Sequence, residues 1–168
     1  MSTFILRAAE ETDRAAVIDL VLRIQNDEYA VGLSLADQPD LAALPHSYAG
    51  GGGAFWVAEV DGAVVGCIGL MALEARVGVL KKFFVEAGHR GTAAGVAAGL
   101  YDALIRRAAS QGFRTLILDT PSVATRSHSF YRKAGFRQID PTALPVPYAY
   151  PDRNCLLFRL DLLADAGT

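Results

Sequence analysis

The fold is decided by residues 77–120, which read VGVLKKFFVEAGHRGTAAGVAAGLYDALIRRAASQGFRTLILDT. An apolar run that ends at Val85 predicts a strand, and a second run at 113–120 predicts another. Between them, Gly112 is suited to end a helix. The apolar positions of that helix recur every four residues, at Val96, Leu100, Leu104 and Ala108. The stretch therefore predicts a strand, a turn, a helix and a strand in that order.

The turn that opens this helix is made of small residues, RGTAAGVA at 90–97. A helix N-terminus presents unpaired backbone N–H groups and the positive end of the helix dipole. Small side chains let an anion approach that backbone closely, and Arg90 adds a charged partner. The turn therefore predicts a pyrophosphate site; the plainer alternative is that the small residues only let the helix pack tightly on the sheet. It matches neither G-x-G-x-x-G nor a P-loop.

The flanking sequence supplies the other elements of a mixed sheet. Ahead of the stretch, residues 5–8 predict a strand, Thr12 a helix cap, and residues 55–73 a hairpin. Behind it, SHSFYRKAGF at 127–136 predicts a short helix and NCLLFRLDL at 154–162 a last strand. This order of elements predicts an α/β fold, more closely an α+β mixed sheet.

Length and composition favour one domain. The chain has 168 residues, of which 52% are hydrophobic and 20% charged, which is enough for one core and unlike a disordered chain. We therefore expect a single domain spanning residues 1–168. No apolar run reaches the roughly 20 residues of a membrane helix, and the N-terminus lacks a signal-peptide pattern. Both observations favour a cytoplasmic protein without a membrane partner.

The net charge of −2 hides an uneven distribution. From Lys81 to Arg137 the chain holds ten Lys and Arg against three acids, whereas the remainder holds six against fifteen. A basic segment in an acidic chain indicates one anionic partner, unless these charges only form scattered solvated faces. Nucleic acid is a poor match, because the pI is about 5.9 and no basic stripe carries interleaved aromatic residues. A small phosphorylated ligand fits better.

From LKKFFVEAGHRG at residue 80 to SFYRKAGF at residue 136, about a third of the chain resembles the GNAT superfamily of N-acetyltransferases. The superfamily pattern is a strand ending in a hydrophobic residue and Val, followed by [QR]-x-x-G-x-[GA] at the start of a helix. Two registers are open: Arg90-x-x-Ala93-x-Gly95, and Thr92-x-x-Gly95-x-Ala97, which we favour. The resemblance implies a GNAT-like acyl-CoA acyltransferase fold. Its central sheet is mostly antiparallel, with a splayed parallel strand pair, and is flanked by helices.

The resemblance also implies acetyl-CoA as the cofactor. Backbone groups of Phe83, Phe84 and Val85 would bind the pantetheine arm as if it were an added strand. Ser127 and Lys133 would add contacts from the short helix that follows. Backbone N–H groups of the turn would hold the pyrophosphate, and the residues so assigned are Arg90, Gly91, Thr92, Ala93, Ala94, Gly95, Val96 and Ala97.

Tyr131 matches the tyrosine that the superfamily places beside the CoA sulfur. The resemblance implies that it is the general acid that protonates the leaving thiolate. From the residues alone, a core tyrosine in a short amphipathic helix is the plainer alternative. The superfamily often has Asn seven residues earlier, where this chain has Ala124, so that contact is missing or is supplied by Thr125 or Ser127.

The general base and the acceptor site are less constrained. The superfamily often takes its base from the strand before the turn, where Val79 stands here. The remaining candidates for a base are Glu28, Glu59, Glu74, Asp119 and His128. The acidic segment 26–46 would suit an amine or polyamine, or it is a solvated loop. We assign Glu28, Tyr29 and Asp119 to substrate binding, with Tyr148 and Tyr150 as further candidates to border the site. No cluster has the spacing of a metal site.

These observations predict an acetyl-CoA-dependent N-acetyltransferase that acts directly on a primary amine of a small molecule, or on a peptide amine. A homodimer is a further expectation. One alternative is a non-catalytic acyl-CoA-binding sensor, which Val79 and Ala124 keep open. A weaker alternative is a structural or nucleotide-binding α/β domain.

Overall fold

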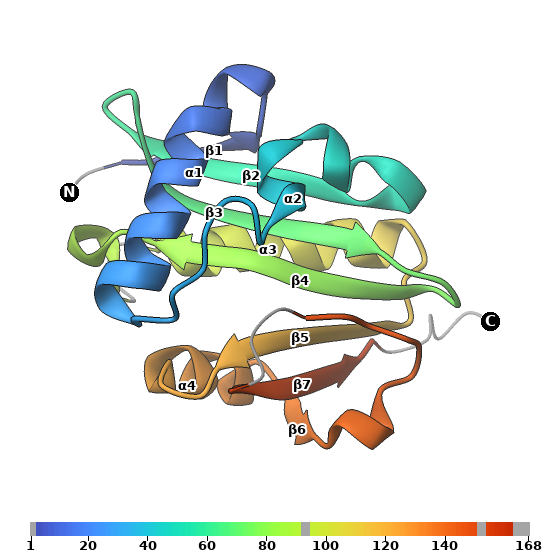
Figure 1. Ribbon diagram of the computed structural model, residues 1–168. Helices are drawn as coiled ribbons and strands as arrows, with labels where there is room; N and C mark the ends of the chain where they lie inside the picture. The colour runs from blue at the N-terminus through green and yellow to red at the C-terminus, as the bar shows by residue number, and fades with distance from the viewer. Residues whose placement is uncertain (1–2, 92–94, 151–153, 163–168) are drawn as a thin grey trace.

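The computed structural model describes residues 3–91, 95–150 and 154–162. Within these ranges one sheet holds seven strands in the order β1-β2-β3-β4-β5-β7-β6 (Figure 1). The strands are β1 (Ile5–Ala8), β2 (Ala54–Val60), β3 (Ala63–Ala72), β4 (Val77–Val85), β5 (Thr115–Pro121), β6 (Arg137–Ile139) and β7 (Cys155–Asp161). Neighbouring strands pair antiparallel except β4 and β5, which are parallel. The predicted mixed sheet is confirmed.

Helices cover both faces of this sheet (Figure 1). They are α1 (Arg14–Arg23), α2 (Pro39–Ala42), α3 (Val96–Ser110) and α4 (Thr125–Lys133), and a π-helical turn, Ile24–Glu28, continues α1. The apolar sides of α1 and α2 pack with Phe55, Val57 and Cys67 of the sheet. The apolar sides of α3 and α4 pack on the opposite face, against residues such as Leu80 and Leu118. We call these the α1/α2 face and the α3/α4 face. None of the helices in the described ranges is both long and apolar enough to cross a membrane.

The prediction that Thr12 caps α1 is wrong. The helix begins at Arg14, and the carboxylate of Asp13 accepts a hydrogen bond from the backbone N–H of Glu10 at 2.8 Å. Arg7 holds the same carboxylate with two hydrogen bonds of 2.7 and 2.8 Å. Thr12 lies inside the 3-10 turn Glu11–Asp13 that precedes the helix, and Glu10 and Asp13 form the capping box of that turn.

The parallel pair β4–β5 splays apart, as the sequence predicts. Its pairing runs only from Val77–Thr115 to Val79–Ile117, although β4 continues to Val85 and β5 to Pro121. A β-bulge lies in the part of β4 that pairs with β3 but not with β5. Between the pairs Cys67–Phe84 and Gly69–Lys81, β4 has one residue more than β3. Lys82 lies at this bulge with φ +54°. The splay opens the sheet between β4 and β5, and the candidate site lies there.

Candidate active site

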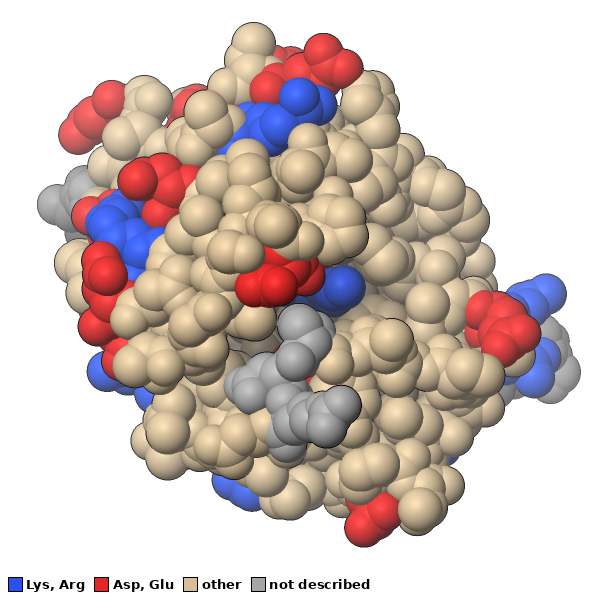
Figure 2. Space-filling model, viewed as in Figure 1, with Lys and Arg blue, Asp and Glu red and all other residues tan. Residues whose placement is uncertain are grey.

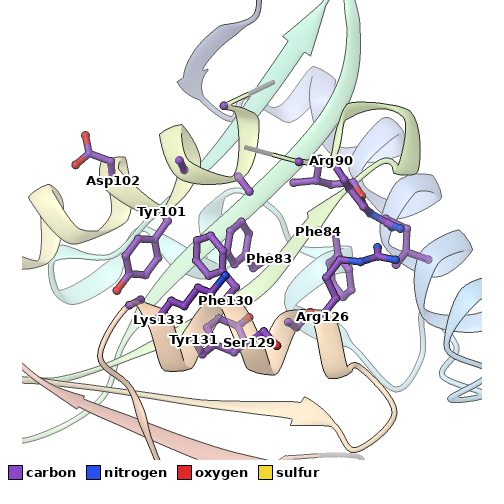
Figure 3. A pocket seen from close by; sticks show the side chains of 18 of the residues that line it. Phe83, Phe84, Arg90, Tyr101, Asp102, Arg126, Ser129, Phe130, Tyr131 and Lys133 are labelled. Atoms are coloured by element: carbon purple, nitrogen blue, oxygen red, sulfur yellow. Dashed lines mark hydrogen bonds between the residues drawn. The ribbon is translucent and has the colours of Figure 1, made fainter. Parts of the chain in front are cut away.

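A cavity of about 810 Å³ lies beside the end of β4, between α3 and α4 (Figure 3). This volume is within the range of cavities that enclose small molecules and cofactors. Its lining residues are Ile24, Tyr29, Phe83, Phe84, Val85, Arg90, Gly91, Gly95, Ala97, Ala98, Tyr101, Asp102, Ile105, Arg126, Ser127, Ser129, Phe130, Tyr131, Lys133 and Ala134. Among them are most of the residues that the sequence assigns to the cofactor.

Aromatic side chains form the inner wall of this cavity. Tyr101 of α3 lies across from Phe130 of α4, with ring centroids 5.4 Å apart. Phe83 of β4 lies against the same Phe130 at 5.3 Å (Figure 3). Tyr101, Asp102 and Ile105 share a wall that sequence analysis did not assign. The signal available for it was the spacing of three to four residues from Ala97 and Ala98 along one helix face.

Two glycines of the turn before α3, Gly91 and Gly95, line the cavity. Gly95 is the N-cap of α3 with φ +72°, and Gly91 has φ +106°. The first hydrogen bond of the helix runs from the N–H of Gly99 to the carbonyl of Gly95, so the N–H groups of residues 96–98 precede the helical ladder. The side chain of Val96 is 2% exposed and belongs to the core, which leaves only its backbone for a ligand. Thr92, Ala93 and Ala94 lie outside the described residues.

Arg90 lines the cavity, but other parts of the chain already bind three of its five N–H donors. Its Nε donates to the carbonyl of Val85 at 2.7 Å. Its two terminal nitrogens contact the carboxylate of Glu28 at 2.7 and 3.0 Å. Arg90 therefore ties the π-helical turn after α1 to the end of β4. Glu28, predicted to bind substrate, is half of this ion pair and does not line the cavity.

Two further basic residues reach the cavity from α4. Arg126 and Lys133 lie seven residues apart, which is two helical turns, so both lie on the helix face that borders the cavity (Figure 3). Lys133 was assigned from the sequence and Arg126 was not. Ser127 lies between them and lines the cavity as well. These exposed cations can hold phosphate groups without the desolvation cost of a buried charge.

Tyr131 is 6% exposed and packs among Phe83, Phe136 and Phe158, with ring centroids 5.7 to 6.4 Å away. Burial, followed by the nearby Tyr29 and Asp119, raises the pKa of its phenol well above the usual range. The phenol is therefore protonated at neutral pH. Its hydroxyl makes no hydrogen bond to any residue that the structure describes, and the side chain borders the cavity. The hydroxyl is therefore available to a ligand.

A small recess of about 50 Å³ adjoins this cavity where β4 and β5 diverge. Tyr29, Phe83, Phe84, Ser127 and Tyr131 line both spaces, so the two are neighbours. The other residues of the recess are Leu80, Lys82, Asp119, Thr120, Pro121 and Ala124. The structure therefore places Tyr29, Asp119 and Tyr131 around one space.

Charged groups and tyrosines surround the recess on the α1/α2 face. Asp119 accepts a hydrogen bond from the hydroxyl of Tyr148. The ammonium of Lys82 lies 3.6 Å from the carboxylate of Asp40, which also accepts a hydrogen bond from the hydroxyl of Tyr48. Burial alone would raise the pKa of Asp40, but Lys82 and the other groups around the carboxylate together lower it. Burial lowers the pKa of Lys82 and raises that of Tyr148.

The structure separates the candidate bases. Val79 is fully buried against Ile117 and Val146, so the position that often supplies the base holds a core residue here. Glu59 is paired with Arg7 at 3.2 Å, and Glu74 is exposed.

The other candidates are Glu28, His128 and Asp119. Glu28 is bound to Arg90, and the Nε2 of His128 lies 2.9 Å from the carbonyl of Pro121. Asp119 is the candidate that lines the recess. In the described part of the chain, no group of His, Cys, Asp and Glu could hold a metal ion.

Solved structures share this architecture. An acetyltransferase from Streptococcus agalactiae superposes with a TM-score of 0.90 and 32% identity, over 95% of this chain and 98% of that one. The PaiA N-acetyltransferase of Thermoplasma acidophilum, solved in complex with coenzyme A, superposes with a TM-score of 0.75 over 95% and 99% of the two chains. At 15% identity, the second comparison shows a shared fold.

Sequence comparisons agree with the structural ones. The uncharacterized N-acetyltransferase YjgM of Escherichia coli is 32% identical over 127 residues, which is 71% of this chain and 74% of that protein. The probable N-acetyltransferase family 8 member 5 of Mus musculus is 32% identical over 106 residues, 60% of this chain. The match spans a little under half of the mouse protein, 46% of its length.

The family model that matches describes the acetyltransferase (GNAT) family and covers residues 18–136. The matched region includes the splayed strand pair, the turn before α3 and most of the cavity lining. This chain belongs to the GNAT acetyltransferase family.

Proposed function

We propose that this chain is an acetyl-CoA-dependent N-acetyltransferase that transfers the acetyl group directly to the primary amine of a small molecule, with Tyr131 as the general acid. Family membership supports the acyl transfer from acetyl-CoA. The observation that carries the choice of Tyr131 is its position. It borders both the large cavity and the recess, and its hydroxyl has no hydrogen-bond partner in the described ranges.

The residues around the cavity fit coenzyme A. The backbone of Phe83, Phe84 and Val85 lies at the unpaired end of β4, where an extended amide chain can add to the strand. The turn at Gly91 and Gly95 and the first N–H groups of α3 suit a pyrophosphate. Lys133 and Ser127 would add contacts from α4. When bound, acetyl-CoA supplies the acetyl thioester.

The residues at the splay supply the acid–base chemistry. A raised pKa keeps the Tyr131 phenol protonated at neutral pH, so it can give its proton to the departing sulfur. Asp119, oriented by the hydroxyl of Tyr148, faces the same recess and would bind the acceptor's ammonium and take its proton, directly or through water. The amine then attacks in its neutral form. Tyr29 would close the recess beside them.

One observation favours a second candidate, the non-catalytic acyl-CoA sensor. Arg90, expected to hold the pyrophosphate, has its donors bound to Glu28 and Val85. Val79 and Ala124, both buried, also stand at positions where the superfamily pattern often has polar residues. A sensor would bind acetyl-CoA without transferring its acetyl group.

A coenzyme A release assay separates the two candidates. Purified protein is mixed with acetyl-CoA and a panel of primary amines, free thiol is followed with time, and products are identified by mass spectrometry. The transferase predicts coenzyme A release that depends on one class of amine, together with the matching N-acetyl product. Release that no amine accelerates, with acetyl-CoA still bound in an isothermal titration, would favour the sensor.

Three broader predictions accompany this proposal. We expect residues 1–168 to form one domain, the protein to reside in the cytoplasm, and the chain to form a homodimer. Limited proteolysis tests the first, cell fractionation the second, and light scattering of the purified protein the third.

A further inference from the structure

Lys82 is a charged residue in a left-handed backbone conformation. It lies at the bulge of β4 with φ +54°, a left-handed conformation that costs a non-glycine residue about 1 kcal/mol or more. Bulges often redirect a side chain next to a functional site. Here the bulge directs Lys82 into the recess that Tyr131 and Asp119 also line.

The ammonium of Lys82 has hydrogen-bond donors to spare. Its side chain is only 10% exposed, and the carboxylate of Asp40 lies 3.6 Å from the ammonium, a long contact for a hydrogen bond. Asp119, which lines the same recess, also attracts this charge. An ammonium carries three donors, so the contact with Asp40 leaves donors that a further acceptor can take. A ligand with anionic oxygens would satisfy them.

Asp119 places the opposite charge on the other wall of the recess. Lys82 comes from β4 and Asp119 from β5, so the two charges flank the gap where the strands diverge. The recess measures about 50 Å³, and one water in the liquid takes roughly 30 Å³. It therefore admits only a few non-hydrogen atoms, such as the polar end group of a small molecule. A ligand that meets both charges must carry its amine and its anion on the same carbon or on neighbouring carbons.

We propose that the acceptor is an α-amino acid or a close analogue, with its carboxylate held by Lys82 and its amino group facing Asp119. This inference rests on the proposed transferase function. A polyamine or plain amine would bring only positive charge towards Lys82 and would leave the donors of Lys82 without acceptors. The N-terminus of a peptide lacks the free α-carboxylate, so it would not satisfy Lys82 either.

Matched acceptors test this on the wild-type protein. The proteinogenic L-amino acids are compared with their α-carboxamides and with the corresponding decarboxylated amines, with coenzyme A release as the signal. At least one amino acid should exceed its amide and its amine in kcat/KM by about 10- to 100-fold, the range expected for hydrogen bonds to a charged group. The difference should lie mainly in KM.

A variant pair assigns the effect to one side chain. Lys82→Met should lower kcat/KM for the preferred amino acid to the level of its amide, again through KM. Lys81→Met is the matched control, because it removes a neighbouring positive charge that does not line the recess. It should retain the preference for the amino acid. Thermal melting and acetyl-CoA titration establish that each variant is folded. If Lys82→Met does not fold, the acceptor series on the wild type decides.

The outcomes separate this inference from the function beneath it. Amides or decarboxylated amines acetylated as well as the amino acids would overturn the inference and leave the transferase standing. A preference that survives Lys82→Met would overturn the role of Lys82. Acetyl-CoA bound but transferred to no acceptor of any kind would overturn the transferase function, and the inference with it.

Discussion

The two faces of the sheet differ in the side chains around their binding spaces and in how deeply the charges are buried. On the α3/α4 face, the cavity has an aromatic inner wall. Three of its charged residues, Arg126, Lys133 and Asp102, are exposed, and the fourth, Arg90, is paired with Glu28. On the α1/α2 face, Asp40 and Lys82 are about nine-tenths buried and lie within reach of tyrosine hydroxyls and Asp119. Figure 2 shows this second face, where charged side chains lie mostly towards the edge while an acidic and a basic group meet near the middle, over β4.

This difference in charge burial suits the binding of two different ligands. A long, flexible cofactor can be held by strand backbone, helix N–H groups and exposed cations, none of which requires a buried charge. Selecting one small polar acceptor requires desolvated charges in fixed positions. We therefore expect substitutions on the two faces to have separable effects. Those on the α3/α4 face should change the affinity for acetyl-CoA, and those on the α1/α2 face should change acceptor kinetics and stability.

Asp40→Asn should have the largest effect on stability. It removes the anionic partner of Lys82, which is 10% exposed, and leaves that cation buried without its ion pair. Breaking a buried pair in this way costs about 3 kcal/mol of unfolding free energy. Urea denaturation measures the loss. Asp37→Asn is the control, because Asp37 is exposed and its carboxylate accepts hydrogen bonds from Ser34 on the surface. This variant should stay within about 0.5 kcal/mol of wild type.

The same carboxylate gives the stability a defined pH dependence. Because the pKa of Asp40 is lower in the folded protein than its ordinary value, its contribution is complete above that ordinary value, about 3.8. The contribution is lost as the pH falls through the folded pKa. Asp40→Asn should therefore flatten the acid limb of the stability curve. An unchanged acid limb would contradict the ion pair.

Asp119→Asn tests the acceptor side by activity. It should lower kcat/KM for the acceptor by about 100-fold, because the amide can neither accept a proton nor bind an ammonium as a charge. Affinity for acetyl-CoA, measured by titration, should stay within about twofold of wild type. Asp102→Asn, on the wall of the large cavity, should change the affinity for acetyl-CoA more than it changes kcat/KM for the acceptor. A large loss of acetyl-CoA affinity in Asp119→Asn would break the separation of the faces.

Gly95→Ala tests the cofactor side. Gly95 has φ +72° at the start of α3, and an added Cβ would meet only Phe4 at 3.7 Å, so the cost comes from the backbone and not from a clash. A strain of 1 to 2 kcal/mol should weaken acetyl-CoA binding by about 10-fold and leave the acceptor KM unchanged. Gly88→Ala is the control, because Gly88 has open space and no positive φ. Equal effects in the two variants would argue against the turn as a phosphate site.

Glu28→Gln should have the smallest effect. Glu28 holds the terminal nitrogens of Arg90, and removing its charge frees that guanidinium to turn towards a phosphate group. Acetyl-CoA should then bind about threefold more tightly, in the range of a partly exposed ion pair. Weaker binding would instead show that Arg90 serves the site by tying the π-helical turn to β4. Titration at low and moderate ionic strength gives both the affinity and its salt dependence.

The sequence predicts well what its local patterns encode. The strand that ends at Val85 and the apolar face of α3 are close together in the sequence, and the structure has both. Gly91 and Gly95, which lie between them, line the large cavity. The sequence patterns do not predict the short elements α2 and β6, which have four and three residues.

The acceptor side could not be predicted in the same way. Asp40, Lys82, Asp119 and Tyr148 come from separate segments, and only the folded sheet brings them together. The sequence suggests Asp119 and Tyr148 separately as residues of the acceptor site, but it gives no sign that Lys82 lies on a bulge. Nor did it indicate that Arg90 would be bound to Glu28, because the two lie on segments far apart in the sequence. Long-range ion pairs leave no periodic signal.

Tyr131 lines both the large cavity and the recess, so Tyr131→Phe tests the central claim most directly. The measurement is kcat for coenzyme A release at saturating acetyl-CoA and acceptor, together with the Kd of acetyl-CoA on the same sample. Removing a general acid should lower kcat by about 100- to 1000-fold, while the phenyl ring keeps the packing against Phe136 and Phe158 and leaves Kd nearly unchanged. A large loss of affinity with kcat unchanged would contradict the role of Tyr131 as the acid.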